Sequence, residues 1–430
     1  MQAGNRSLLC WRRGREAALA LFATLTLGGA ASAAEVEVTA FGARCDGATN
    51  DQAAFEAAVA HLEQAGGGVL RLPAATCVHE RTIQLRSNVS LMGQGWDASV
   101  LQRTKSGVSS LRAHGKRGAR ISNVLIADLK IVGVTGYERG YRKGSHAVEI
   151  QHADGVTVRN VWAQRIGGEA FYAQGDDNRR IAFLFNRATD IGHNAYNFNG
   201  RPLESRVVGN YARDIWANGL EAAGADLEVA DNVFERYRLW GVIIGNLYAE
   251  GRMTERVRVE RNVLRHSRGK PSESGGMLFA AGGRDVHVAN NTIHDNAGYG
   301  IYINGTTKIG KFKVELPGDL VIENNTIHDN GDGVRNTAGI HIRGSPPNIV
   351  IRRNRLFSSR ERGRSQRVGV RVAKGNATIS IADNLAYDHG EANYVIGTNG
   401  NAGTPAFRQN KSGYGNQLRV VDGRGRSFKF

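Results

Sequence analysis

The sequence contains little proline and almost no cysteine. It has 7 prolines and 3 cysteines among 430 residues, whereas glycine is abundant at 55. Collagen is excluded because its triple helix needs abundant proline and a strict glycine triplet. A zinc site of the familiar cysteine-rich kind is excluded because too few cysteines are present. Many glycines with few prolines suit a chain that turns often and keeps its backbone N–H groups for pairing.

Negatively charged residues are fewer than positively charged ones, and no long apolar run occurs after the first thirty residues. The chain is 41% hydrophobic and 22% charged, which excludes disorder because such a chain can build a core. Lysine and arginine exceed aspartate and glutamate, and the formal net charge is +16. This excess favours a polyanionic partner without saying which one.

The first 33 residues are typical of a secretory signal peptide. Four arginines precede an apolar run over 17–27, and Ala31-Ser32-Ala33 forms a small-residue cleavage site. The run is shorter than the roughly 20 residues that span a bilayer, so we expect cleavage and no membrane span. The mature chain is then periplasmic or secreted. Cleavage removes Cys10, and in an oxidising compartment we expect the remaining Cys45 and Cys77 to form a disulfide.

A repeated phrase dominates the sequence from about residue 121. Alternating apolar residues lead to an asparagine, a variable turn and another short apolar segment, with the asparagine recurring every 22 to 34 residues. The asparagines are Asn160, Asn186, Asn210, Asn232, Asn262, the pairs 290–291 and 324–325, Asn354 and Asn384. Periods of this length with two-residue alternation predict a parallel β-helix, and asparagines at equivalent bends are expected to stack along its axis. Two copies of Thr-Ile-His-Asp-Asn, at 292–296 and 326–330, are interpreted as turn chemistry.

The predicted fold is therefore all-β: a right-handed parallel β-helix solenoid of about ten coils with an N-terminal capping helix. The helix is expected over 52–65, with Phe55, Ala58, Val59 and Leu62 on its apolar face, Asn50 or Asp51 as its cap, and glycines 66–68 ending it. After the signal peptide we expect one domain over 34–430. It divides into a cap and first strands (34–95), repeated coils (121–400) and a C-terminal cap or tail (401–430).

Three segments resemble the opening of the pectate-lyase-like superfamily. They are Phe41-Gly42-Ala43 followed by Asp46-Gly47 and Asn50-Asp51, then Gly66-Gly67-Gly68-Val69, and then residues 87–95, Ser-Asn-Val-Ser-Leu-Met-Gly-Gln-Gly. The resemblance implies the right-handed β-helix fold and a carbohydrate ligand. The superfamily includes polysaccharide lyases, polygalacturonase-type hydrolases, alginate epimerases and phage tailspikes, so the resemblance does not choose the reaction.

Aligning the strand after each asparagine predicts a column of outward side chains on successive coils. The column is Glu149, Tyr172, Asn197, Glu221, Ile243, Leu278, Tyr302, His341 and Arg371, with Gln151, Gln174, Asn199, Asn304 and Arg343 in the next outward column. Coils are expected about 4.8 Å apart, so neighbours in the column can touch one sugar. Two polar groups emerge, one around Tyr172 and His193 and one around Tyr302. Lysine- and arginine-rich loops at 265–275, 306–318 and 358–367 are expected to wall the groove.

The favoured hypothesis is a lyase that cleaves an acidic, uronate-containing polysaccharide by β-elimination. Tyr172 or His193 would serve as base or acid, and Arg201 would neutralise the uronate. Glu149, Asn197 and Glu221 would bind substrate or, if a metal is used, Ca²⁺. Tyr302, His341, Arg343 and Arg371 would bind further sugars. Neither a cofactor nor an oligomeric state follows from the sequence.

Two alternatives stay open. A polygalacturonase-like hydrolase would pair two carboxyl groups drawn from Glu149, Asp176, Asp177 and Glu221. A non-catalytic polysaccharide-binding β-helix is the third class. The Asp-Pro-His element usual in alginate epimerases is absent, which argues against that branch, and the export signal argues against nucleic acid as the partner.

Overall fold

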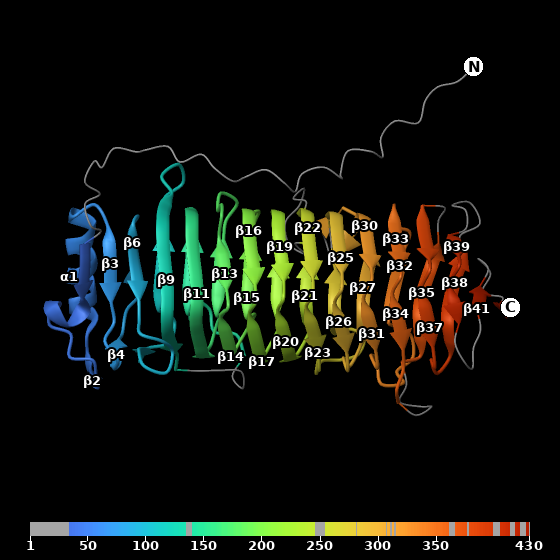
Figure 1. Cartoon of the computed structure of the whole chain (residues 1–430), viewed down its shortest axis with the longest axis horizontal. Helices are drawn as coiled ribbons and strands as arrows, with labels where there is room; N and C mark the ends of the chain where they lie inside the picture. The colour runs from blue at the N-terminus through green and yellow to red at the C-terminus, as the bar shows by residue number, and fades with distance from the viewer. Residues whose placement is uncertain are drawn as a thin grey trace, which may run out of the picture. The chain divides into compact units, whose positions relative to one another are not determined.

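The computed structural model describes residues 34–134, 140–245, 254–280, 282–306, 308–309, 312–313, 315–360, 366–375, 378–398, 405–412, 418–421 and 427–429. The expected signal peptide lies outside these residues. From Ala34 onward the chain winds into coils that stack in sequence order (Figure 1). Strands of each coil pair in parallel with equivalent strands of the next coil, which confirms the predicted parallel β-helix.

Three lines of strands run the length of the solenoid. Face B is the 14-stranded sheet of β5 (Ile83–Gln84), β8 (Leu111–His114), β10 (Val148–Gln151), β12 (Phe171–Gln174), β15 (Tyr196–Asn199), β18 (Leu220–Ala222), β21 (Trp240–Ile244), β24 (Gly275–Phe279), β27 (Tyr299–Gly305), β32 (Ile340–Gly344), β35 (Val368–Gly375), β38 (Ala392–Thr398), β41 (Leu418–Val421) and β42 (Ser427–Lys429). Its strands are parallel except β42, which is antiparallel to β41. The other two lines merge into one 26-stranded sheet because β9 and β11 are long enough to belong to both.

The first of these lines we call face A1. It comprises β1 (Ala34–Glu37), β3 (Gly68–Arg71), β6 (Val89–Met92), β9 (Ile121–Val132), β11 (Ala153–Ile166), β13 (Ala182–Leu184), β16 (Leu203–Val208), β19 (Ala225–Ala230), β22 (Thr254–Glu260), β25 (Gly283–Ala289), β30 (Gly318–Glu323), β33 (Ile349–Arg352), β36 (Ile379–Ala382) and β39 (Ala406–Arg408).

Face A2 is the second line. It comprises β2 (Asp46–Asn50), β4 (Thr76–His79), β7 (Val100–Arg103), β9, β11, β14 (Arg187–Ile191), β17 (Tyr211–Ile215), β20 (Val233–Tyr237), β23 (Val263–Arg265), β26 (Thr292–His294), β31 (Thr326–His328), β34 (Arg355–Phe357), β37 (Leu385–Tyr387) and β40 (Lys411–Ser412). Outside the three faces lie a small hairpin of β28 (Lys308–Ile309) and β29 (Phe312–Lys313) and a 3-10 turn, η1 (Val38–Phe41).

The core fills the inside of the coils. Because alternate residues of a strand point to opposite faces, every second side chain of each coil enters this interior. Aromatic rings there stack across coils: Phe171 lies 5.1 Å from Tyr196, and Phe183 lies 5.3 Å from Phe198. These rings have almost no exposed surface, so burial of apolar area stabilises each coil only when its neighbour is in place.

The asparagine ladder predicted from the repeat is present along the solenoid. Asn210 donates from Nδ2 to Oδ1 of Asn232 (2.9 Å), and that same oxygen accepts the backbone N–H of Asn210 (2.9 Å). The pattern continues through Asn262, Asn291, Asn325, Asn354, Asn384 and Asn410. Each asparagine of the ladder, which we call a rung, thus accepts hydrogen bonds from the asparagine of the preceding coil and donates one to a buried backbone carbonyl.

One expectation about these polar turns needs correction. Asn160 is not a rung, because its side chain donates to Asp128 (2.6 Å) from a left-handed residue with φ 50°, and the ladder instead begins at Asn186. In the pairs 290–291 and 324–325 the rungs are Asn291 and Asn325, the residues from which the spacing of the repeat is counted. Asp51 does not cap the helix with its carboxylate, which accepts the backbone N–H groups of Arg44, Cys45 and Val78.

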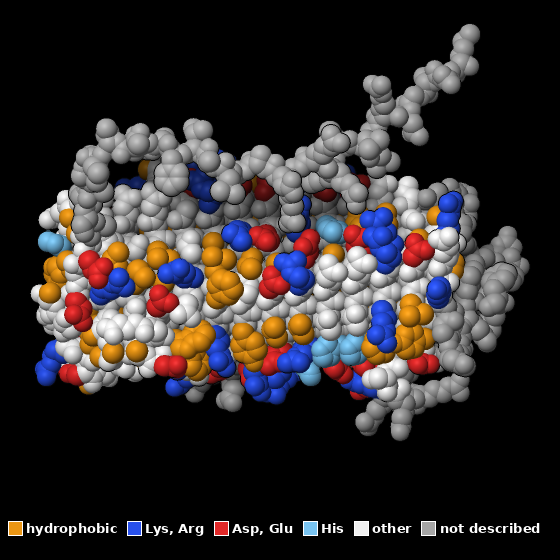
Figure 2. Space-filling view, viewed as in Figure 1, with side chains coloured by type: hydrophobic (Ala, Val, Ile, Leu, Met, Phe, Trp, Pro, Cys, Tyr) orange, Lys and Arg blue, Asp and Glu red, His pale blue; other side chains and the backbone are white. Residues whose placement is uncertain are grey.

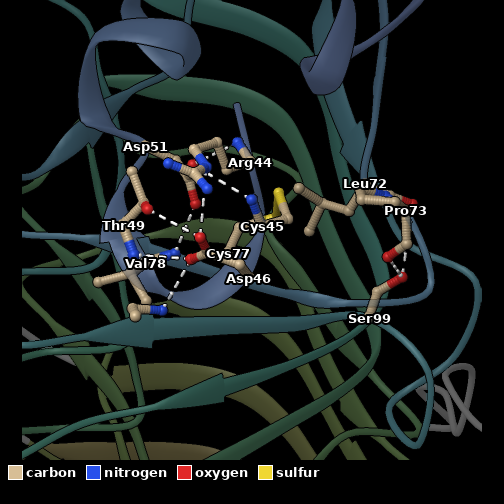
Figure 3. The surroundings of a disulfide bond; sticks show 11 residues. Arg44, Cys45, Asp46, Thr49, Asp51, Leu72, Pro73, Cys77, Val78 and Ser99 are labelled. Atoms are coloured by element: carbon tan, nitrogen blue, oxygen red, sulfur yellow. Dashed lines mark hydrogen bonds and ion pairs between the residues drawn. A yellow bond between two sulfur atoms is a disulfide. The ribbon is translucent and has the colours of Figure 1, made fainter. Parts of the chain in front are cut away.

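The N-terminal end is covered by helix α1 (Gln52–Gln64), as predicted, with its four expected apolar residues buried. Asn50 accepts the N–H of Gln52 (3.1 Å) and so caps the first turn. Cys45 and Cys77 form a disulfide beside Asp51 (Figure 3). The disulfide joins the segment before the helix to β4. In the described part of the chain, no helix has both the length and the apolar character to cross a membrane.

Candidate functional site

Face B carries the outward column that the sequence predicts. The strand pairings place Glu149 beside Tyr172, Tyr172 beside Asn197, and Asn197 beside Glu221. The same column continues through Ile243, Leu278, Tyr302, His341 and Arg371. The alignment of the repeat is therefore confirmed residue by residue, whereas the roles of these residues stay predictions.

A second column, two residues before each strand of face B, holds the most buried polar groups of the site. Because Val148, Phe171, Tyr196 and Leu220 are in register, the residues two positions earlier also stack on successive coils. These residues are His146, Glu169, Asn194 and Asn218, and all four are buried. Asn218 donates from Nδ2 to Oδ1 of Asn194 (3.0 Å) and accepts the N–H of Trp240 (3.0 Å). Hydrogen bonds of side-chain amides therefore hold the C-terminal end of this column, at Asn194 and Asn218, in place.

Glu169 is the centre of the site. One carboxylate oxygen lies 2.8 Å from Nδ1 of His193, and the other lies 2.6 Å from Nδ1 of His146, with only 5% of the Glu169 side chain exposed. Nδ1 of His146 also accepts the backbone N–H of Glu169 (3.1 Å), so the side-chain hydrogen bond of Glu169 to a histidine is the one with Nδ1 of His193. Burial alone would raise the pKa of Glu169, but the interactions with His146 and His193 outweigh it and lower this pKa to about 2. Glu169 is therefore a buried anion that lies beside two imidazoles and orients that of His193.

His193 is the more accessible of the two histidines. Its side chain is 31% exposed, against 5% for His146, and its ring packs on Tyr141 at 4.5 Å. With Nδ1 held by Glu169, the neutral imidazole presents its Nε2 lone pair away from the carboxylate. An imidazole held in this way can accept a proton from a substrate.

Tyr172 flanks the same carboxylate. Its ring lies 4.9 Å from His146, and its hydroxyl donates to Gln174 (3.1 Å) and accepts from Asn199 (3.4 Å). Burial, followed by the negative charge of Glu169, raises the pKa of Tyr172 well above its usual value. Tyr172 therefore keeps its proton at neutral pH and can donate it.

Glu221 lies two coils from Tyr172, and its pKa is shifted in the opposite direction to that of Glu169. Burial raises its pKa to about 7, and nearby Glu169 adds to the rise, against the effects of His193 and a hydrogen bond from Asn194 (3.3 Å). Between the two glutamates, Asn197 donates to Glu169 (3.4 Å), while its buried Oδ1 has no hydrogen-bond partner among the described residues. Two carboxyl groups with widely separated pKa values thus lie in one site.

Glu149 does not fit the expected Ca²⁺ set. One oxygen accepts from Ser109 (2.7 Å) and Arg112 (2.9 Å), and the other accepts from Gln174 (2.9 Å). Glu149 is also three coils from Glu221, about 14 Å at the usual strand spacing, whereas Ca²⁺ ligands lie 2.3–2.6 Å from one ion. Glu149, Asn197 and Glu221 therefore do not form one ligand set.

Arg201 lies away from the Glu169 cluster. It follows β15 and forms an ion pair with Glu255 (2.5 Å) on β22, two coils further along. Asp177, one of the expected hydrolase carboxylates, pairs instead with His152 (2.8 Å). Both side chains are therefore engaged in contacts between coils.

The second predicted cluster is assembled as expected. His341 lies edge-on to Tyr302 at 5.4 Å, and a hydrogen bond with Tyr302 raises the pKa of Arg343. Burial, then Arg371 and Arg343, lowers the pKa of His341 to about 4, so this imidazole is neutral at pH 7. Arg371 forms an ion pair with Glu391 (3.3 Å).

An apolar cluster separates the two polar groups. Ile243 and Leu278 are 3% and 8% exposed and pack with Trp240, Ala280 and Tyr299. Trp240 stacks on both Tyr299 and Tyr302, at 6.2 and 6.1 Å. Tyr302 is five coils from Tyr172, about 24 Å, so the two polar groups can contact only different parts of a long ligand.

The sequence alone assigned no role to Glu169, His146 or Tyr141. His146 and Glu169 belong to the column that precedes the strands, and the alternating pattern of the strands does not extend to that position. The signal that could have found them is the repeat itself, since polar residues recur two positions before the strand on four successive coils.

Two families match this chain. Residues 35–232 match the family described as rhamnogalacturonase A/epimerase, pectate lyase-like, and residues 204–386 match the right-handed β-helix region. The chain belongs to the pectate-lyase-like superfamily. The right-handedness expected of the solenoid follows from this membership, since the family fold is a right-handed helix.

The proteins to which this chain is similar differ in activity. Alginate lyase 7 of Azotobacter vinelandii is 27% identical over 154 residues, which cover 32% of this chain and 18% of that protein, so the chain spans under a fifth of that relative's length. The A-module of A. vinelandii mannuronan C-5 epimerase AlgE6 superposes with a TM-score of 0.70 at 17% identity, covering 88% of this chain and all of that one. The catalytic unit of a GH87 α-1,3-glucanase from Streptomyces thermodiastaticus gives 0.68 at 16% identity, covering 90% and 71%. The Streptococcus pneumoniae adhesin PfbA gives 0.63 at 15%, covering 92% and 98%. The shared fold therefore does not choose among these activities.

Proposed function

We propose that this protein is a polysaccharide lyase that cleaves an acidic, uronate-containing polysaccharide by β-elimination. The observation that carries the proposal is the buried Glu169 carboxylate, which holds Nδ1 of His193 and leaves Nε2 for the substrate. Nε2 removes the proton from C5 of the uronate, the electron pair forms the C4–C5 double bond, and the C4–O bond breaks. The departing oxygen takes its proton from the Tyr172 hydroxyl, whose raised pKa keeps it protonated until then.

Proton abstraction at C5 also needs a group that neutralises the uronate carboxylate. We assign this role to Glu221 in place of Arg201, because Arg201 is paired with Glu255. With a pKa of about 7, Glu221 is largely protonated below neutrality and can donate a hydrogen bond to the carboxylate as negative charge builds up. Asn197, with its unpartnered oxygen, lies between Glu221 and Tyr172 and would bind a sugar hydroxyl.

The remaining residues of the face B column complete the proposed groove. Tyr302, His341, Arg343 and Arg371 would bind sugars distant from the point of cleavage, and Glu149 would hold Arg112 and Gln174 in position beside it. No Ca²⁺ enters this scheme, because the residues expected to bind it do not converge.

An acidic polymer outside the cytoplasm is the proposed substrate. Removal of residues 1–33, with their four arginines and Glu16, leaves a net charge of +16 − 3 = +13, which would attract a polyanion. Export by this segment would place the enzyme where such polymers occur. The curated relative is named as an alginate lyase and one structural neighbour as a mannuronan epimerase, which makes uronate polymers the first substrates to test.

A hydrolase is the second candidate because Glu169 and Glu221 have pKa values of about 2 and about 7, the kind of division that acid–base pairs show. It is less favoured because Glu169 is 5% exposed and both of its oxygens face imidazoles. A binding-only role would leave the Glu169–His193 pair without a purpose.

The test is a panel of uronate polymers incubated with the protein, following absorbance of unsaturated uronate and reducing ends together. A lyase raises both signals, a hydrolase raises reducing ends alone, and an epimerase exchanges the C5 hydrogen with deuterated water without cleavage. His193→Gln and Tyr172→Phe should each lower the rate by about 10²–10⁴-fold. The matched variants His287→Gln and Tyr387→Phe, on faces A1 and A2, should retain it.

Arg201→Gln decides between the two assignments of the neutralising group. Unchanged activity supports Glu221 in that role, and a loss as large as that of His193→Gln returns it to Arg201. If no polymer of the panel is modified by the wild-type protein, the enzyme proposal is wrong for that substrate class.

A further inference from the structure

Face A2 carries a second cluster of chemically active side chains, remote from the face B column. His266 follows β23, and His294 and Asp295 lie at the end of β26 on the next coil. Because Arg265 pairs with His294, the next residues in each coil, His266 and Asp295, lie side by side. One ligand atom from each of His266, His294 and Asp295 lies within 4.8 Å of the other two, and all three residues are partly exposed. Figure 2 shows histidines gathered on this part of the surface.

The backbone that carries these three side chains is held by the amide of Asn296. Its Nδ2 donates to the carbonyl of Leu264 (3.1 Å), and its Oδ1 accepts the N–H of Ser267 (3.0 Å). These two bonds lie on either side of His266, so the residue after Asp295 fixes the segment that bears His266. Both His266 and Asp295 are left-handed residues, with φ of 62° and 55°. The three groups are therefore positioned by the fold before any ligand binds.

The carboxylate of Asp295 contacts both His294 and Arg360. The two nearby guanidinium groups are already paired. Arg360 contacts Asp332 (3.1 Å) as well as Asp295, and Arg265 contacts Glu235 (2.6 Å).

We propose that His266, His294 and Asp295 bind one divalent first-row transition metal ion such as Zn²⁺. Two imidazole nitrogens and one carboxylate oxygen form a common three-ligand set for this ion, with a fourth position open to water. Nδ1 of His294 and Oδ2 of Asp295 lie 2.5 Å apart, and a metal ion bound by both groups would replace the hydrogen bond between them. The ion would join the coils of β23 and β26.

Among the described residues, the next copy of the Thr-Ile-His-Asp-Asn phrase does not assemble the same three groups. His328 and Asp329 repeat the pair at 2.7 Å, but Asp329 also accepts hydrogen bonds from Ser358 and Ser359. The residue that distinguishes the first copy is His266, which comes from the preceding coil.

The experiment is titration of untagged protein with Zn²⁺ against a chromophoric chelator, with thermal unfolding measured in parallel. We expect about one ion per chain, proton release on binding and a higher unfolding temperature. His266→Ala and Asp295→Asn should each weaken binding at least tenfold and abolish the thermal shift. His287→Ala, which removes a histidine paired with Glu323, should bind as the wild type does.

A gain of affinity gives an independent test. Arg360→Gln removes the competitor for Asp295 and should tighten binding. Absence of saturable binding by the wild type, or equal binding by His266→Ala, overturns the proposal. Neither result affects the lyase proposal, because the two sites share no residue.

Discussion

Replacing Glu169 with glutamine removes the buried charge on which the candidate site depends. The pKa of Glu169 falls from 4.5 to about 2 on folding, and each pKa unit is worth about 1.4 kcal/mol between the two states. The ionised carboxylate therefore contributes about 3 kcal/mol to the free energy of unfolding at neutral pH. Because its pKa is lowered in the folded state, this contribution is complete above pH 4.5 and is lost as the pH falls toward 2.

Glu169→Gln should thus lose about 3 kcal/mol of stability at pH 7 in urea unfolding, and the loss should shrink only below about pH 4.5. Glu228→Gln is the matched control, since Glu228 forms an exposed ion pair with Arg206 (2.8 Å) and should lose less than about 1 kcal/mol. Histidine titration by NMR should show that His193 no longer has a fixed tautomer. Equal losses in the two variants at pH 7 would refute the reasoning, as would a loss that stays constant to pH 3.

Three further predictions concern other parts of the molecule. Asn291→Ala removes the acceptor of the buried Asn262 N–H and the side-chain donor to the Val259 carbonyl, and should cost about 2–5 kcal/mol in urea unfolding. Asn290→Gly, at an exposed left-handed residue, should cost little. Glu221→Gln should become more stable than the wild type above pH 7 by about 1–3 kcal/mol, because a carboxyl group whose folded pKa is raised to about 7 destabilises the fold once ionised; an unchanged pH–stability curve would contradict this. Reducing the Cys45–Cys77 disulfide, which closes a loop of 32 residues, should cost about 3–4 kcal/mol, measured as the unfolding midpoint with and without reductant.

Features that recur in every coil could be predicted from the sequence, whereas contacts that occur in a single coil could not. The order Glu149, Tyr172, Asn197, Glu221 could be derived because strand side chains alternate with a period of two and each coil restarts at an asparagine. Asn291 could be predicted as a rung for the same reason.

The errors arise where a contact is specific to one coil. The pairing of Arg201 with Glu255 joins residues 54 positions apart and two coils away, and no local pattern encodes it. Asn160 was counted as a rung because its neighbours fit the repeat, but the carboxylate of Asp128 is the partner it finds. His146 was missed because it lies before its strand, where the two-residue alternation does not apply.

Because of the asparagine ladder, the register between coils does not depend on the number of residues in each coil. From Asn210 onward, successive rungs are between 22 and 34 residues apart, yet each step uses the same pair of amide hydrogen bonds. Residues can therefore be added to or removed from the connecting loops without shifting the outward column of face B. The walls of the groove can change during evolution, or be exchanged by an engineer, while the floor on which Tyr172 and Glu221 lie keeps its spacing.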